Sequence, residues 1–94
     1  MIKRRYDKII ELMCEYKGIS RKELCKLLKD KNCKYMLFLL LRKYGVGYEF
    51  IKKDMPTFSK RTINCNFKRA EKMFLINKEF RDMYFEFEDE IEKI

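Results

Sequence analysis

The segment from Cys33 to Tyr44 constrains the fold more than any other part of this 94-residue chain. Its side chains are apolar over much of a helix's circumference, a pattern typical of a helix in the centre of a bundle. The longest apolar run within it, Tyr35–Leu41, is far too short to cross a bilayer. We therefore expect a helical domain built around this segment, with no membrane contact.

Amphipathic patterns on both sides predict the helices that cover the central one. Gly18 is expected to end the first helix, and the capping box Ser20–Glu23 to begin the second. A charged connector at 29–32 precedes the central helix, and two glycines at 45 and 47 follow it. Helices are expected at about 3–17, 20–28, 33–44, 48–54, 59–76 and, after a break near Asn77, 77–94.

The predicted fold class is all-α, a compact bundle of five to six helices in a single domain covering residues 1–94. Only three glycines and one proline interrupt the chain, which favours helices over a sheet. Residues 84–88 alternate as a strand would, but a lone strand of five residues has nothing to pair with. Helix is therefore the preferred interpretation for the C-terminal segment.

Several classes of function lack their characteristic residues. The chain has no histidine and no Gly-rich phosphate loop, and its acidic cluster at 86–92 is too close in sequence for an acid/base pair. The cysteines at 14, 25, 33 and 65 form no C-x-x-C pair. We expect no enzymatic activity, no metal, no cofactor and no small-molecule substrate. Charges between Lys3 and Lys8 argue against a signal peptide, so reduced, mostly buried thiols in a cytoplasmic protein are predicted.

The charge is unevenly distributed along the chain. Residues 1–78 carry 21 Lys/Arg against 8 Asp/Glu, whereas residues 79–94 carry 2 against 7, within a net charge of +8. A basic body with an acidic final segment suits a polyanionic partner. A Lys-rich composition can also follow from the codon usage of an AT-rich genome, so the charge alone decides little.

The arrangement of residues 48–76 is more specific. A helix at Tyr48–Asp54, a turn at Met55–Phe58 and a helix at Ser59–Ile76 give the helix-turn-helix layout, whose second helix enters the major groove of DNA. An ordinary capped amphipathic helix with a charged exterior is the alternative. Phe58 is expected to pack on the helix as a hydrophobic staple, with a wedge inserted into a groove as the less favoured alternative. The stripe Ile63, Phe67, Ala70 and Phe74 is expected to face the core.

The first turn of the second helix is polar, as expected where a recognition helix meets DNA. Lys60 and Arg61 are expected to reach phosphate or guanine, and Ser59 and Thr62 to bond phosphate or a base. Asn64 and Asn66 are placed on the non-apolar faces, where an asparagine pointed into the groove reads adenine. A basic flank is then formed by Lys68, Arg69 and Lys72.

At this point the chain resembles the C-terminal DNA-binding domain of the bacterial replication initiator DnaA, over nearly its whole length. The segment VGYEFIKKDM lies where that family has its first motif helix, SKRTINCNFKRAEKM where it has its recognition segment, and ISRKELCKLL where it has a short helix. Order, lengths and apolar spacing carry the match. The resemblance implies an all-helical fold and recognition of double-stranded DNA in replication initiation or its regulation.

The chain also departs from that family's pattern. Ser59, Lys60 and Arg61 stand where the family has aspartate, histidine and its first threonine, Thr62 keeps the second threonine, and Phe58 replaces an arginine. A longer arginine-rich loop, used by the family against the DNA backbone, is reduced to Lys29, Lys31 and Lys34. These lysines are expected to hold the backbone. The departures imply a stand-alone domain, from a phage, a mobile element or a cryptic regulator, with a target of its own or none.

Two functional hypotheses follow. The first is a nucleoid-associated protein that binds double-stranded DNA through Ser59, Lys60, Arg61, Thr62, Asn64, Lys68 and Arg69, with Lys29, Lys31 and Lys34 on the backbone. The alternative is a protein-interaction module that kept the scaffold and lost DNA reading. Exposed aromatics such as Phe85 are then expected to contact a protein partner or form a weak homodimer.

Overall fold

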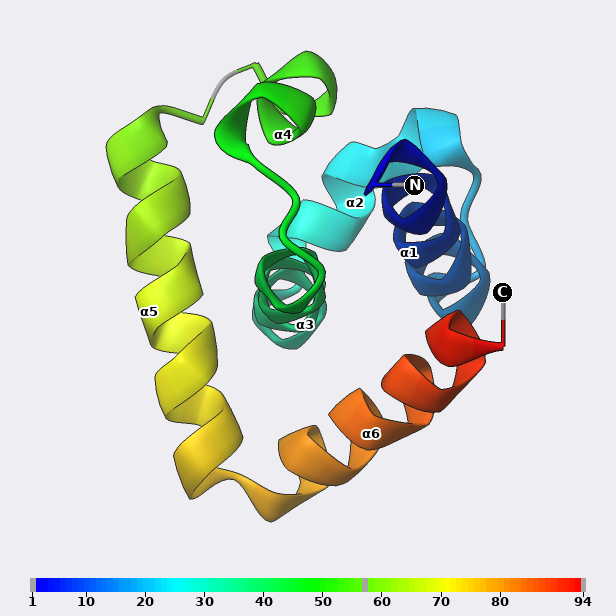
Figure 1. Cartoon of the computed structure of the whole chain (residues 1–94), viewed down its shortest axis with the longest axis vertical. Coiled ribbons are helices and arrows are strands. Elements are labelled where there is room, and N and C mark those ends of the chain that lie inside the picture. Colours follow the sequence, from blue (N-terminus) through cyan, green and yellow to red (C-terminus); the bar gives the residue numbers. More distant parts are fainter. Residues whose placement is uncertain (1, 57, 94) are drawn as a thin grey trace.

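The computed structural model describes residues 2–56 and 58–93, with the backbone alone at 2, 3 and 54. These residues form six α-helices, one short 3-10 turn and no strand, so the predicted all-α fold is confirmed (Figure 1). The helices are α1 (Ile2–Lys17), α2 (Leu24–Lys29), α3 (Lys31–Lys43), α4 (Tyr48–Asp54), α5 (Lys60–Ile76) and α6 (Lys78–Glu92), with the 3-10 turn η1 (Arg21–Glu23) before α2.

The apolar segment predicted to be central is α3. Figure 1 shows it in the middle of the molecule, with the other helices around it. Leu37, Phe38, Leu40 and Leu41 of α3 are fully buried. Burying one such side chain contributes roughly 1.5–3 kcal/mol, so α3 supplies much of the stability of this small domain.

Two glycines end helices as the sequence predicts. Gly18 after α1 and Gly45 after α3 both adopt positive φ, 73° and 71°, which a side chain would disfavour. After α1 the Ile19 amide donates to the Cys14 carbonyl at 3.0 Å, and after α3 the Val46 amide donates to Leu41 at 2.9 Å. Each end is therefore closed by a Schellman-type turn that bonds otherwise free carbonyls.

The predicted connector at 29–32 is wrong. Only Asp30 separates α2 from α3, because its carboxylate caps α3 by accepting from the Cys33 amide at 3.2 Å. The same carboxylate accepts from Lys17 Nζ at 2.8 Å, and this bond is the main reason why the pKa of Asp30 is lowered. Lys31 and Asn32 consequently belong to the first turn of α3.

Aromatic contacts join α4 and α5 to the rest of the bundle. Phe50 of α4 packs against Tyr6 of α1, with ring centroids 6.2 Å apart. α5 packs along α3, where Phe67 meets Phe38 edge-on at 5.6 Å. The break near Asn77 is confirmed, because its side chain accepts from the Phe80 amide at 3.0 Å and starts α6.

The C-terminal segment is helical, as preferred over a strand. Its apolar face is largely as predicted, with Phe80, Tyr84, Phe87 and Ile91 buried. Burial is the main cause that raises the pKa of the Tyr84 hydroxyl. Ile94, expected on the same face, lies outside the described residues.

The four cysteines are all free thiols, but only half of them are buried. Cys14 and Cys33 lie in the core, where burial raises the pKa of each thiol, while Cys25 and Cys65 are exposed. The prediction of mostly buried thiols is therefore wrong for Cys25 and Cys65, which lie on the outer faces of α2 and α5. Within the described residues, no helix is both long and apolar enough to traverse a lipid bilayer.

Candidate nucleic-acid interface

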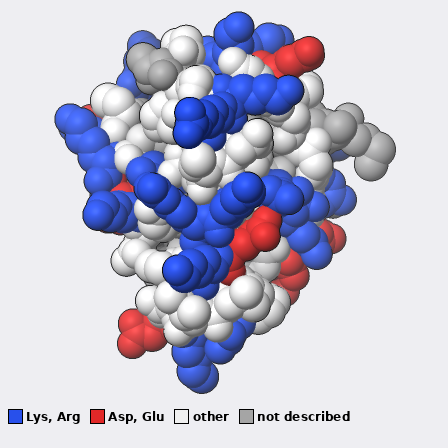
Figure 2. Space-filling view, turned by 90° about the vertical axis from the view of Figure 1, so that its left-hand side faces the viewer, with Lys and Arg blue, Asp and Glu red and all other residues white. Residues whose placement is uncertain are grey.

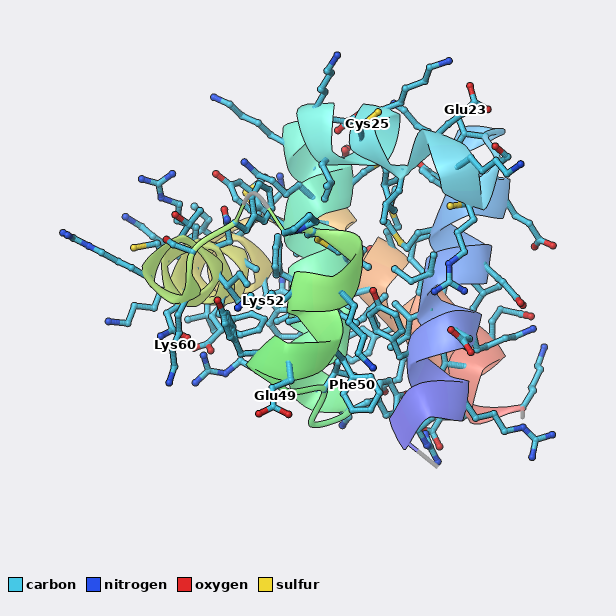
Figure 3. All side chains as sticks on the ribbon, turned by 90° about the horizontal axis from the view of Figure 1, so that it is seen from above. Glu23, Cys25, Glu49, Phe50, Lys52 and Lys60 are labelled. Atoms are coloured by element: carbon cyan, nitrogen blue, oxygen red, sulfur yellow. The ribbon has the colours of Figure 1, made fainter. Side chains whose placement is uncertain are left out.

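The two helices predicted to form a helix-turn-helix unit are present with the expected bounds. α4 spans Tyr48–Asp54, and α5 begins at Lys60 with Ser59 as its N-cap. Within the predicted turn, the Phe58 amide donates to the Met55 carbonyl at 3.1 Å, while Thr57 lies outside the described residues. Figure 1 shows α5 from the side, and Figure 3 shows it end-on with α4 from the side, so the two helices cross.

The hydroxyl groups at the start of α5 serve the helix itself. Ser59 Oγ accepts from the Thr62 amide at 3.1 Å and lies 2.9 Å from Thr62 Oγ1. Both side chains remain exposed. The polar first turn is therefore partly explained by capping, and the Thr62 methyl group is the part of that side chain free to meet a ligand.

Phe58 faces the protein interior. Its half-buried ring stacks on Phe38 of α3, with centroids 6.0 Å apart and planes inclined by 28°. Phe58 thus packs inward against α3, where a staple on α5 was expected. This contact fixes the start of α5 on α3.

The outer surface of α5 is a basic stripe. Arg61, Cys65, Lys68 and Lys72 follow one another at helical spacing on the side opposite the core, and all four are exposed. Lys60, Asn64 and Arg69 are exposed beside them. Figure 2 looks onto this side of the molecule and shows Lys and Arg over most of its width, with a smaller acidic area between them. We call these seven residues the α5 outer surface.

The cations of the α5 outer surface carry no ion pair with any other described residue. They are Lys60, Arg61, Lys68, Arg69 and Lys72. Figure 3 shows Lys60 on the outer side of α5, away from α1. Because these charges are solvated and unpaired within the described part of the chain, an approaching polyanion need not break an internal bond to reach them.

Asn66 is not available as a reading residue. It is only 5% exposed, and its Nδ2 donates to the Thr62 carbonyl at 3.0 Å. Its placement on a non-apolar face is therefore wrong. The apolar stripe of α5 is wide enough to include this position between Ile63 and Ala70, and the backbone bond satisfies the buried amide. Asn64, in contrast, is exposed as predicted.

The three lysines expected on a loop lie on helices instead. Lys29 ends α2, while Lys31 and Lys34 lie in the first turns of α3. Lys31, Lys34 and Phe38 share one stripe of α3, and Phe38 contacts Phe58 and Phe67 on the α5 side. The structure therefore brings Lys31 and Lys34 to the edge of α3 that meets α5, whereas Lys29 belongs to α2.

Two basic residues of this region escaped the sequence interpretation. Arg42 continues the same stripe of α3, with its guanidinium 5.5 Å from the Phe67 ring and its Nε 3.0 Å from Glu71 Oε1. It thereby neutralises the acidic residue of α5 next to the basic stripe. Lys52 of α4 lies between α4 and α5 in Figure 3. The sequence did hold a signal for each residue. Arg42 stands four residues after Phe38, and Lys52 stands in the last turn of the predicted helix 48–54.

The described residues hold no group of three or more His, Cys, Asp or Glu side chains able to bind a metal ion. No family model, no curated protein and no solved structure matches this chain. Inference about function therefore depends on the chemistry of the α5 outer surface and on its place in the α4–α5 unit.

Proposed function

We propose that this protein is a DNA-binding protein, not an enzyme, and that it binds double-stranded DNA with α5 in the major groove. The observation that carries the proposal is the α5 outer surface, whose five cations make no ion pair among the described residues. The second helix of a helix-turn-helix unit is the element that enters the groove.

Phosphate contacts supply most of the affinity in this proposal. Lys68 and Lys72 of the stripe are proposed to contact phosphates. Lys31 and Lys34 extend the positive surface from α5 onto α3. Each phosphate that a cation neutralises releases counterions, so affinity falls steeply as salt rises. This term attracts any duplex and fixes the protein on it, without reading sequence.

The contacts with DNA bases are assigned to side chains in the first two turns of α5. Arg61 is exposed there and has the geometry for a bidentate contact with guanine, while exposed Asn64, one turn later, suits adenine. The Thr62 methyl group suits the methyl group of thymine. This distribution resembles that of the replication-initiator domain, but with Ser59, Lys60 and Arg61 changed, so we propose a target sequence distinct from that family's.

The test compares binding of a random-sequence duplex to the wild type and to K60A/R61A, by fluorescence anisotropy at two or more salt concentrations. We expect a loss of roughly tenfold or more at low salt, and a salt dependence shallower by about 2 in log–log slope. The matched control K78A/K93A removes two exposed lysines, one at each end of α6, and should bind like the wild type. Unchanged affinity in a folded K60A/R61A variant would refute this placement of the surface.

A protein-interaction module is the second candidate, favoured by one observation. Leu75 and Ile76 at the end of α5 are 72% and 71% exposed, more than any other large apolar side chain described. Phe85, predicted as such a contact, is 47% exposed, but its ring packs edge-on against Phe74 and Tyr84. If the wild type does not bind duplex DNA at low salt in the anisotropy measurement, this candidate is favoured over the first.

A further inference from the structure

A groove between α1 and α6 has an apolar floor and an acidic rim. Leu12 and Tyr16 of α1 and Met83 and Phe87 of α6 line it, around a volume of about 660 Å³. Tyr16 is 54% exposed and meets Phe87 edge-on at 5.4 Å. Apolar side chains that stay contiguous along a groove open to solvent, as these four do, are characteristic of docking sites.

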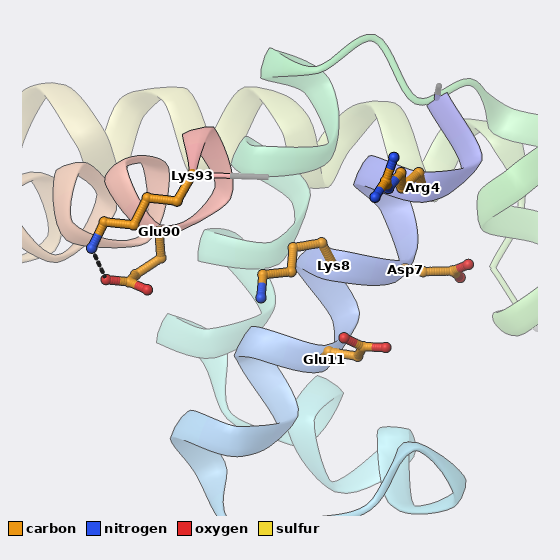
Figure 4. A pocket seen from close by; sticks show the side chains of 6 residues that line it. All are labelled: Arg4, Asp7, Lys8, Glu11, Glu90 and Lys93. Atoms are coloured by element: carbon orange, nitrogen blue, oxygen red, sulfur yellow. Dashed lines mark hydrogen bonds and ion pairs between the residues drawn. The ribbon is translucent and has the colours of Figure 1, made fainter.

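The rim gives the groove a negative charge. Glu86, Asp89, Glu90 and Lys93 surround the apolar floor. Glu90 accepts from Lys93 at 2.9 Å, as Figure 4 shows, so these two charges cancel. Glu86 and Asp89 have no ion pair with another described residue. An occupant of this groove should therefore combine apolar side chains with positive charge.

A neighbouring hollow is unsuited to such an occupant. It is smaller, about 370 Å³, and is lined entirely by charged side chains: Arg4, Asp7, Lys8, Glu11, Glu90 and Lys93 (Figure 4). With both signs of charge and no apolar floor, it offers no hydrophobic anchor. The apolar groove next to it is the better docking site.

The same chain presents a surface with the complementary properties. Leu75 and Ile76 project from the last turn of α5, and the exposed lysines Lys68 and Lys72 precede them on the stripe. We call Leu75 and Ile76 the apolar knob. In Figure 1, α6 meets α5 at one end and lies next to α1 at its other end. The knob and the groove are therefore separate surfaces of one molecule.

We infer that the apolar knob of one molecule docks in the α1–α6 groove of a second copy. Apolar side chains meet an apolar floor, while Lys68 and Lys72 lie beside the knob and Glu86 and Asp89 beside the groove. Because the two surfaces differ, the contact is head-to-tail, so two docked molecules still carry a free knob and a free groove. Further molecules can then add, in an open chain or in a ring if the rotation between copies closes.

The contact is small, and this determines when it forms. A stable interface normally buries about 800 Å² on each partner, far more than two aliphatic side chains provide. Free molecules should therefore associate weakly. If the proposed function holds, duplex DNA and a second copy compete for Lys68 and Lys72, so DNA should weaken this contact and not strengthen it.

The test is sedimentation of the wild type without DNA, so its outcome does not depend on the proposed function. We expect the average mass to rise with concentration, and to rise less when salt screens the charges. L75E/I76E, which blocks the knob, and Y16K, which blocks the groove, should each remain monomeric. N64E, a charge change elsewhere on α5, should associate like the wild type.

Mixing the two blocked variants separates a head-to-tail contact from a symmetric one. L75E/I76E keeps its groove and Y16K keeps its knob, so the mixture should form a complex of two chains and nothing longer. If Y16K does not fold, E86K/D89K leaves every apolar side chain in place and serves the same purpose. A monomeric wild type at about 1 mM, where a contact with a Kd of 1 mM is substantially formed, would overturn the inference. Failure of the blocked variants to combine would also overturn it.

Discussion

The charged side chains of α5 and α6 differ in the contacts that they make with the rest of the bundle. On α6, Glu88 lies 3.6 Å from Lys43 Nζ, and Glu92 accepts from the Tyr44 hydroxyl at 2.7 Å. Glu92 also lies 3.5 Å from Arg5 of α1. On α5, the five cations of the outer surface have no such partner among the described residues.

This difference separates charged side chains that stabilise the fold through ionic contacts from charged side chains that do not. Glu88 and Glu92 of α6 reach across to α1 and to the end of α3, and so attach the last helix to the bundle. The hydrogen bond from Tyr44 is the main reason why the pKa of Glu92 is lowered. The cations of α5 give the fold no comparable contact. A surface charge that does not serve the fold is the better candidate for binding a ligand.

The largest expected effect comes from the contact that holds α5 on the bundle. Phe38 is fully buried and packs against both Phe58 and Phe67. Phe38→Ala should lower the free energy of unfolding by about 3–5 kcal/mol, through lost burial and the cavity left behind. Leu39→Ala, at the neighbouring half-buried position, should cost clearly less. Denaturant unfolding measures both, and an equal loss would contradict a central role for Phe38.

The next effect tests the outer surface of α5 directly. Reversing two charges in R61E/K68E should weaken binding to duplex DNA by roughly 100-fold or more at low salt, because contacts are lost and repulsion is added. The free energy of unfolding should change by less than about 0.5 kcal/mol, as for ordinary surface substitutions. Anisotropy and denaturant unfolding measure the two quantities on the same preparation.

A charge reversal on α6 is the counterpart of that experiment. Glu88→Lys places a cation opposite Lys43, so it should destabilise the fold while leaving DNA affinity unreduced. If R61E/K68E destabilises the fold, or Glu88→Lys alone weakens DNA binding, the two helices do not divide their roles in this way. Circular dichroism of each variant confirms that only folded protein is compared.

Smaller effects are expected at the two N-caps. Ser59 caps α5 and Asn77 caps α6 by the same kind of bond, to the amide three residues on. Ser59→Ala and Asn77→Ala should each lower the free energy of unfolding by about 1 kcal/mol. Only Ser59→Ala should also change DNA affinity, since it frees the Thr62 hydroxyl beside the proposed interface. Equal DNA affinities of the two folded variants would show that the cap and the interface are independent.

Much of this fold was predictable because its local signals agree with one another. Periodicity identified the central helix, Gly18 and Gly45 ended helices with positive φ, and Ser59 and Asn77 marked two starts. The connector predicted at 29–32 was wrong because an aspartate that both caps a helix and binds Lys17 looks, in sequence, like part of a polar loop. Which role Asp30 takes depends on where α1 lies in three dimensions.

The candidate surface was less predictable than the fold. Exposure of Lys60, Arg61, Asn64, Lys68 and Arg69 followed from helical spacing alone. The burial of Asn66 did not, because an amide that bonds the carbonyl four residues earlier can enter a core face. The pairing of Arg42 with Glu71 joins two helices that are distant in sequence, so no local pattern announces it.

The smallest effect is a change in the acid stability of the fold. The pKa of Glu92 is lowered in the folded protein, so its ionised form stabilises the fold above the unfolded value of about 4.3. That stabilisation disappears as the pH falls through the lower folded value. Glu92→Gln should therefore lose less stability than the wild type on acidification below about pH 4.3. The loss remains small because the pair is exposed and screened.

Lys72→Gln is the matched control on α5, since it neutralises a charge without a partner among the described residues. Its acid unfolding profile should run parallel to that of the wild type, because no carboxylate in the described part of the chain depends on it. Denaturant unfolding from pH 7 to pH 2 gives both profiles. A Glu92→Gln profile parallel to the wild type, or a flattened Lys72→Gln profile, would mean that the charges of α6 hold the fold no more than those of α5.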